Sequence, residues 1–174
     1  MDDLRYPIGT FTFDPETAPA QRQSWIEEIA AAPAKIRAAV AGLAADQLDT
    51  PYRESGWTVR QVIHHLADSH LNSYVRFKLA LTETDPTIKP YDETRWAEMP
   101  DARIGRAEIS LELLEALHER WTITLRAMSE ADFGRAFIHP DMGRVTLDRA
   151  LALYAWHCRH HTAHITSLRS RMGW

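Results

Sequence analysis

Apolar residues recur every three to four positions along four long stretches of the chain, the period of a helix with one buried face. The clearest stretch runs from about Val59 to Thr84. Thr58 precedes it as an N-cap, and Gln61 follows at the capping-box position. The pattern predicts an all-α fold, a four-helix bundle in one domain over residues 1–174. The other three stretches are about Pro19 to Gly42, Glu108 to Met128, and Leu147 to Arg171 after a Thr146 cap and before Gly173.

The segments between these helices carry the proline and glycine residues that interrupt the pattern. Pro33 lies inside the first helix and predicts a kink or a break there. The connection from Pro86 to Pro100 is long enough to cover a pocket. Ser129 to Val145 is expected to be irregular, and Ala44 to Leu48 to form a short turn. Residues 1–17 predict an extended arm that packs on the bundle through Tyr6, Phe11 and Phe13.

Composition narrows the class of protein. Of the 174 residues, 45% are apolar, which is an ordinary globular composition. The net charge of −4 argues against a nucleic-acid partner, because phosphate binding needs a concentrated basic surface. The single cysteine, Cys158, excludes an internal disulfide and a cysteine-rich zinc site. The acidic N-terminus does not predict a signal peptide, and no apolar run predicts a membrane span, which needs roughly 20 such residues. A cytoplasmic protein without a membrane partner is expected.

Histidines gather in two clusters, each on a predicted helix. Four of the nine lie within the segment 157–164, as the pairs His157/His161 and His160/His164. Residues four apart share one face of a helix, so either pair can present two imidazole nitrogens to one metal ion. The second cluster, about ninety residues upstream, holds His64, His65 and His70. We therefore expect the two clusters to meet inside the bundle and to hold a divalent metal ion.

Spacing alone does not select the ligands. Both pairs on the last helix are possible, and the three upstream histidines compete, although His64 and His65 point about 100° apart. His70 and His161 lie on apolar stripes and are also compatible with core packing. His118 and His139 are interpreted as ordinary solvated or core histidines.

A family resemblance selects among these possibilities. The chain resembles the YfiT group of metal-dependent hydrolases in the DinB-like superfamily, and the likeness spans nearly its whole length. Segments that carry it include Gly56-Trp57-Thr58-Val59-Arg60-Gln61-Val62-Ile63-His64-His65-Leu66-Ala67-Asp68-Ser69-His70, Pro90-Tyr91-Asp92-Glu93, His160-His161-Thr162-Ala163-His164-Ile165 and Arg171-Met172-Gly173-Trp174.

The resemblance implies an up-down-down-up four-helix bundle, a homodimer, and one divalent metal ion held by His65, His160 and His164. The metal it implies is zinc, with nickel also possible. The implied activity is hydrolysis of a small-molecule substrate by water that the metal activates. A low-molecular-weight-thiol S-transferase, of the bacillithiol or mycothiol type, and a non-catalytic metal-binding module are the alternatives, because an open metal position suits a thiolate as well and a fold does not prove an activity.

Several other residues are open to a role beside the metal or to a purely structural one. No acidic residue is obviously placed as a general base, so the water would rely on the metal alone or on a loop group such as Asp92 or Glu93. Asp68 is interpreted as an exposed carboxylate or as a partner that orients His65. Arg60 and Arg76 are interpreted as surface ion pairs or as binders of an anionic substrate group. Trp57, Tyr91 and Trp96 are interpreted as core aromatics or as residues that shape the pocket.

Overall fold

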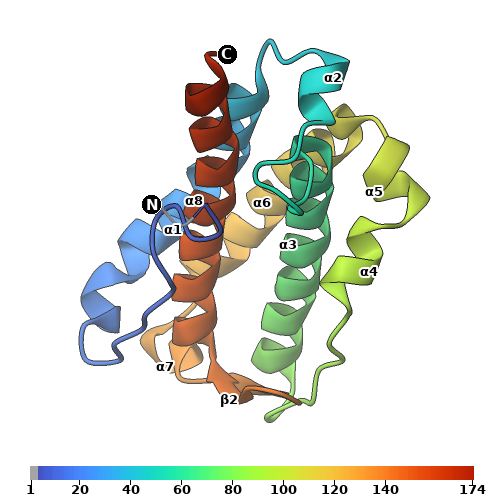
Figure 1. Cartoon of the computed structure of the whole chain (residues 1–174). Helices are drawn as coiled ribbons and strands as arrows, with labels where there is room; N and C mark the ends of the chain where they lie inside the picture. The colour runs from blue at the N-terminus through green and yellow to red at the C-terminus, as the bar shows by residue number, and fades with distance from the viewer. Residues whose placement is uncertain (1–3) are drawn as a thin grey trace.

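The computed structural model describes residues 4–174, so Met1 to Asp3 of the predicted arm lie outside the described residues. Four long helices form the bundle: α1 (Ala18–Val40), α3 (Val59–Thr82), α6 (Ala107–Ala127) and α8 (Leu147–Met172). In Figure 1, α1 and α8 run up the page and α3 and α6 run down, so the order is up-down-down-up as expected. Around the bundle, α8 packs on α1 and α3, and α6 packs on the same two helices.

The helix boundaries follow local signals in the sequence. The Thr58 hydroxyl accepts a hydrogen bond from the backbone N–H of Gln61, and the Gln61 side chain accepts one from the N–H of Thr58, which completes the predicted capping box. Thr146 caps α8 in the same way through the N–H of Arg149, and Gly173 ends it with a left-handed φ of 73°. The two helices that carry the histidine clusters are thus fixed at residues that the sequence predicts.

Pro33 does not break α1, which continues as one helix from Ala18 to Val40. Proline lacks an N–H, so the carbonyl of Ile29, four residues earlier, loses its ordinary helical partner. The Nδ1 atom of His118 lies 2.6 Å from that carbonyl oxygen and replaces the missing donor. Of the predicted kink or break, the break is therefore wrong. A side chain of α6 satisfies the carbonyl that the proline leaves free.

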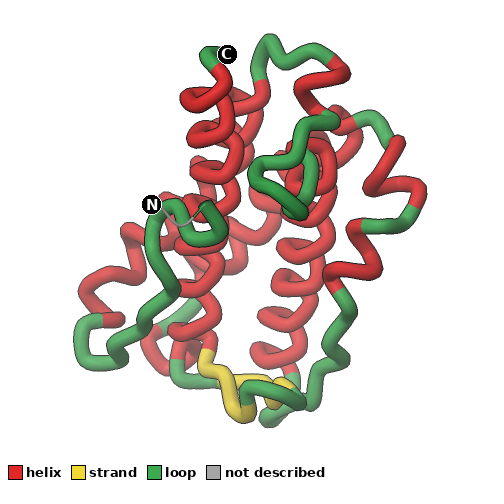
Figure 2. The backbone as a smooth tube through the Cα atoms, viewed as in Figure 1, coloured by secondary structure: helices red, strands yellow, loops and turns green. Residues whose placement is uncertain are grey.

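The short turn expected at Ala44 to Leu48 is the helix α2 (Ala45–Leu48). The connections also hold short elements that the sequence pattern did not separate. They are α4 (Glu93–Ala97), α5 (Pro100–Ile104), α7 (Glu130–Phe133), and the antiparallel strands β1 (Ala136–His139) and β2 (Gly143–Thr146). Segment 129–145, which was expected to be irregular, thus forms a helical turn and a hairpin at the lower end of the bundle (Figure 2). Ile138 bonds through its backbone to Pro86 and Ile88, so the hairpin is tied to the chain that follows α3.

Large apolar side chains fill the bundle, and Trp121 and Phe77 at its centre are fully buried. The arm before α1 lies along α8, where Tyr6 and Phe11 come within 6.0 Å of ring centroids on that helix. No helix of residues 4–174 combines the length and the apolar character that crossing a bilayer requires.

Candidate metal centre

A cavity of about 550 Å³ opens between α3 and α8, and five histidines line it. The N-terminal arm, the loop between α2 and α3, and the start of α4 complete its walls. Both predicted histidine clusters therefore reach one cavity from two different helices. The five histidines are His65 of α3 and His157, His160, His161 and His164 of α8.

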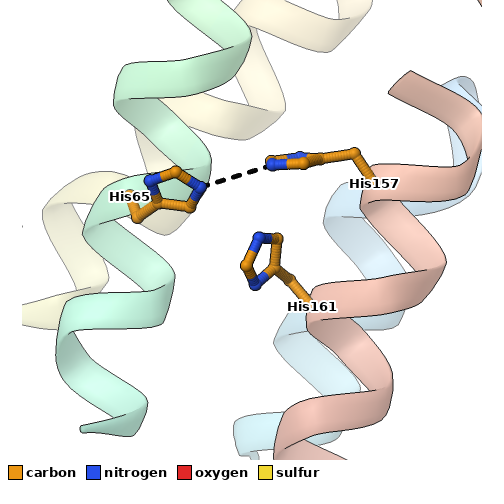
Figure 3. A group of neighbouring side chains, drawn as sticks. All are labelled: His65, His157 and His161. Carbon is orange, nitrogen blue, oxygen red and sulfur yellow. Dashed lines mark hydrogen bonds between the residues drawn. The ribbon is translucent and has the colours of Figure 1, made fainter. Parts of the chain in front are cut away.

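Three of these rings converge from the two helices (Figure 3). One ligand atom from each of His65, His157 and His161 lies within 4.8 Å of the other two. The Nε2 atoms of His65 and His157 are 3.3 Å apart. Two nitrogens bound to one tetrahedral zinc ion at 2.0–2.1 Å would be about 3.3–3.4 Å apart, so this pair already has the separation of two ligands. His161 directs one ring nitrogen toward the other two rings and the second one away from them.

A second group lies on α8 alone. His160, His161 and His164 also have one ligand atom each within 4.8 Å of the others. Among residues 4–174, neither of the two groups contains the full predicted set of His65, His160 and His164, because His65 belongs to the first group and the other two belong to the second. His161 is common to both groups.

His164 and His160, the members of the second group that the first group lacks, differ in their hydrogen bonds. The Nε2 atom of His164 lies 3.1 Å from the carbonyl oxygen of Arg5, and its Nδ1 lies 3.2 Å from Nδ1 of His161. Both ring nitrogens of His164 are thus engaged. His160 stacks on Trp156 at 4.3 Å, and within the described chain its buried Nδ1 has no hydrogen-bond partner. That unpartnered nitrogen is the feature that favours His160 as a ligand.

Burial keeps the rings of the cavity neutral. It lowers the pKa of His65 to about 4, with smaller contributions from the neighbouring His160 and His164. Burial likewise lowers the pKa of His157 and His161 well below the ordinary value, and the adjacent histidines add to the effect. A neutral imidazole is the form that binds a metal ion, so the environment leaves the lone pairs of these rings available near pH 7.

The remaining histidines have other positions. His64 turns away from His65: its Nδ1 lies 2.7 Å from the Ser110 hydroxyl and its Nε2 lies 3.3 Å from the Gly105 carbonyl. His70 is fully buried between α3 and α6, where its Nδ1 lies 2.7 Å from Nε2 of His118. His118, interpreted from the sequence as an ordinary histidine, is therefore part of a hydrogen-bonded chain.

Aromatic and acidic residues line the cavity beside the histidines. The Trp57 ring lies 4.6 Å from that of His65, and Tyr91 and Glu93 come from the long connection after α3. Glu93 lines the cavity, whereas Asp92 caps α4 by accepting from the N–H of Arg95. Trp96 packs on Tyr91, with 4.4 Å between the ring centroids, and supports the cavity wall from outside.

The other residues singled out from the sequence have structural contacts. Arg60 pairs with Asp49 at 2.7 Å and donates to the Gly105 carbonyl. Arg76 lies near His139, whose pKa it lowers together with burial, the larger cause. The hydrogen bonds within residues 4–174 do not connect the Asp68 carboxylate to His65, and burial raises the pKa of Asp68 to about 6. Neither arginine is among the described residues that line the cavity.

Comparison with known proteins agrees with this architecture. The family model of the DinB superfamily matches residues 28–165, and the chain belongs to that family. Proteins of Bacillus cereus (strain AH820) and Bacillus anthracis (strain A0248), both named "Putative metal-dependent hydrolase", are 54% identical to it over the full length of both chains. A solved structure described as "YfiT from Bacillus subtilis is a probable metal-dependent hydrolase with an unusual four-helix bundle topology" is 51% identical, covers 99% of each chain, and superimposes with a TM-score of 0.96.

The sequence contains a signal for the pair that faces α3. The apolar stripe of α8 includes Leu151, Tyr154 and Cys158, and His161 lies on that same stripe. A residue on the stripe faces the interior, and a residue one turn earlier shares its direction. This periodicity favours His157 and His161 over the pair that the resemblance selected.

Proposed function

We propose that this protein is a metal-dependent hydrolase of small molecules in which His65, His157 and His161 hold one divalent metal ion, in first place zinc. The observation that supports it is the convergence of three neutral imidazoles from two helices at the wall of a 550 Å³ cavity. Three histidine ligands with an accessible fourth position are typical of catalytic zinc sites. Nickel also accepts imidazole and remains an alternative.

A metal ion bound there supplies Lewis acidity and lowers the pKa of a water molecule toward neutrality. The chain's own residues supply the rest. Trp57 packs against His65 and limits its movement, and Tyr91 forms an aromatic wall on which the apolar part of a substrate can rest. Glu93 lines the same cavity, and we assign to its carboxylate the role of accepting a proton from the attacking water.

Metal content after zinc loading and removal of excess zinc tests the ligand set. The wild-type chain should retain about one equivalent, and His65→Ala, His157→Ala and His161→Ala should each lose it. His160→Ala is the matched comparison, because it removes an imidazole from the same cavity and the same helix. Retention by His160→Ala supports the proposed set. If His157→Ala retains zinc and His160→Ala loses it, the result would instead favour His65, His160 and His164 as the metal ligands.

Activity assays separate the possible reactions. Zinc-loaded protein is incubated with a panel of esters and amides, and separately with electrophiles in the presence and absence of bacillithiol. Hydrolysis that is independent of thiol, and absent from His65→Ala, supports the hydrolase. A rate that rises with thiol concentration identifies the S-transferase, and metal binding without turnover in either assay identifies a binding module. Sedimentation of the wild-type chain tests the homodimer that we propose with this function.

A further inference from the structure

Two chains of hydrogen bonds lead from the cavity to backbone carbonyl groups. The first runs from His157 through His70 and His118 to the carbonyl of Ile29, with separations of 3.1, 2.7 and 2.6 Å. The second runs from His161 through His164 to the carbonyl of Arg5, with separations of 3.2 and 3.1 Å. We call them the Ile29 chain and the Arg5 chain.

A carbonyl oxygen only accepts hydrogen bonds, so it determines the direction of every bond in its chain. In the Ile29 chain, His118 must carry its proton on Nδ1 to donate to the carbonyl. Nε2 of a neutral His118 then accepts from Nδ1–H of His70. Nε2 of His70 in turn accepts from Nδ1–H of His157. The proton of His157 is therefore on Nδ1. Its Nε2 carries the lone pair and accepts from Nε2–H of His65, 3.3 Å away, in the metal-free protein.

The Arg5 chain gives the same result at the second histidine of α8. His164 must carry its proton on Nε2 to donate to the Arg5 carbonyl, so its Nδ1 accepts from Nδ1–H of His161. The Nε2 atom of His161 keeps its lone pair. This is the nitrogen that Figure 3 shows directed toward His65 and His157, since the bond to His164 uses Nδ1.

We propose that His70, His118 and His164 are positioning residues: anchored on the carbonyls of Ile29 and Arg5, they hold His157 and His161 in the Nδ1–H tautomer, so that both present Nε2 to the metal site. This inference rests on the proposed ligand set. It requires neutral rings, and His70, His118, His161 and His164 are all buried in the bundle. Hydrogen bonds that fix the tautomer of a ligand histidine contribute to metal affinity.

The assignment also gives Pro33 and His164 defined roles. Pro33 leaves the Ile29 carbonyl without a helical donor, and His118 takes that position. His164, predicted from the resemblance to bind the metal directly, acts here through His161. Its Nε2 faces the backbone carbonyl of Arg5, whereas Nε2 of His157 faces Nε2 of another candidate ligand, His65.

Nitrogen-15 NMR of the metal-free wild-type protein tests the chains without any substitution. The two ring nitrogens of a neutral histidine differ in shift according to which one is protonated, and a free side chain prefers the Nε2–H form. We expect His70, His118, His157 and His161 as Nδ1–H tautomers and His164 as Nε2–H. Observation of His157 or His161 as Nε2–H would overturn the assignment, even if zinc binds. The expected tautomers in a chain that binds no zinc would instead leave the assignment standing and remove the proposed function.

Two pairs of variants then measure the effect on zinc affinity by competition with a chromophoric chelator. His70→Gln can accept from His157 at the position of Nε2, whereas His70→Leu cannot. His164→Asn can accept from His161 at the position of Nδ1, whereas His164→Leu cannot. We expect the two leucine variants to bind zinc about 10–100-fold more weakly and the amide variants to recover most of that loss.

The outcomes separate a positioning role from the others. Equal loss in His164→Asn and His164→Leu would identify His164 as a ligand and overturn its positioning role. Wild-type affinity in folded His70→Leu, together with an unchanged His157 tautomer, would overturn the Ile29 chain. A purely structural role would lower the melting temperature of the leucine variants without changing either the tautomers or the zinc affinity.

Discussion

Acidification should destabilise the metal-free protein strongly, because its buried histidines take up protons less readily than the same histidines in the unfolded chain. Burial lowers the pKa of His65 and of His118 to about 4, against 6.5 in the unfolded chain. Between these values the unfolded state binds more protons than the folded state, so the free energy of unfolding is highest above about pH 6.5 and falls as the pH is lowered toward 4. From pH 7 to pH 5 each of these two groups removes about 2 kcal/mol.

Asp68 acts in the opposite direction over the same range. Burial raises its pKa to about 6, so it takes up a proton in the folded state and offsets about 1 kcal/mol of the loss. The net loss of unfolding free energy from these three groups is about 3 kcal/mol. His70, His157 and His161, the other buried histidines of the Ile29 and Arg5 hydrogen-bond chains, add to this loss with the same sign. This is a large part of the roughly 5–15 kcal/mol that stabilises an ordinary domain.

Urea unfolding in the presence of a chelator, followed by tryptophan fluorescence at pH 7 and pH 5, measures the loss. His118→Gln removes one of the titrating rings and should reduce the difference between the two pH values by about 2 kcal/mol. His139→Gln is the control, since His139 lies on the hairpin outside the bundle core and should change the difference less. A loss smaller than about 1 kcal/mol in the wild-type chain would refute the reasoning.

Three further predictions concern the scaffold. Thr58→Ala removes the N-cap of α3 and should cost about 1 kcal/mol in urea unfolding, with Thr58→Ser close to wild type. Gly105→Ala places a Cβ atom 2.2 Å from the carbonyl oxygen of Asp101 and should cost roughly 1–3 kcal/mol, measured as a lower melting temperature. Cys158 is buried, which raises its thiol pKa to about 12, so a thiol reagent should modify it only after denaturation; rapid reaction of the folded protein would contradict this burial.

The helices could be predicted from the sequence because their signals are local. The capping box of Thr58 and Gln61 and the glycine at position 173 act over one turn of chain, and the apolar period identifies the buried face of each helix. The hairpin of β1 and β2 was missed since two four-residue strands carry too little alternation to be recognised. The absence of a break at Pro33 could not be predicted because the donor that compensates for the proline, His118, lies 85 positions further along the chain.

The sequence by itself determined that two histidine clusters lie on two amphipathic helices of one bundle, because helical periodicity is a property of each segment alone. Which rings meet is a different matter, since it depends on how α8 is rotated against α3, and packing sets that rotation. The tertiary structure brought His157 and His161 to His65 and directed His64 toward Ser110. It also joined His118 and His164 to backbone carbonyls far away in the sequence. Hydrogen-bond direction along such chains exists only once distant segments are packed together.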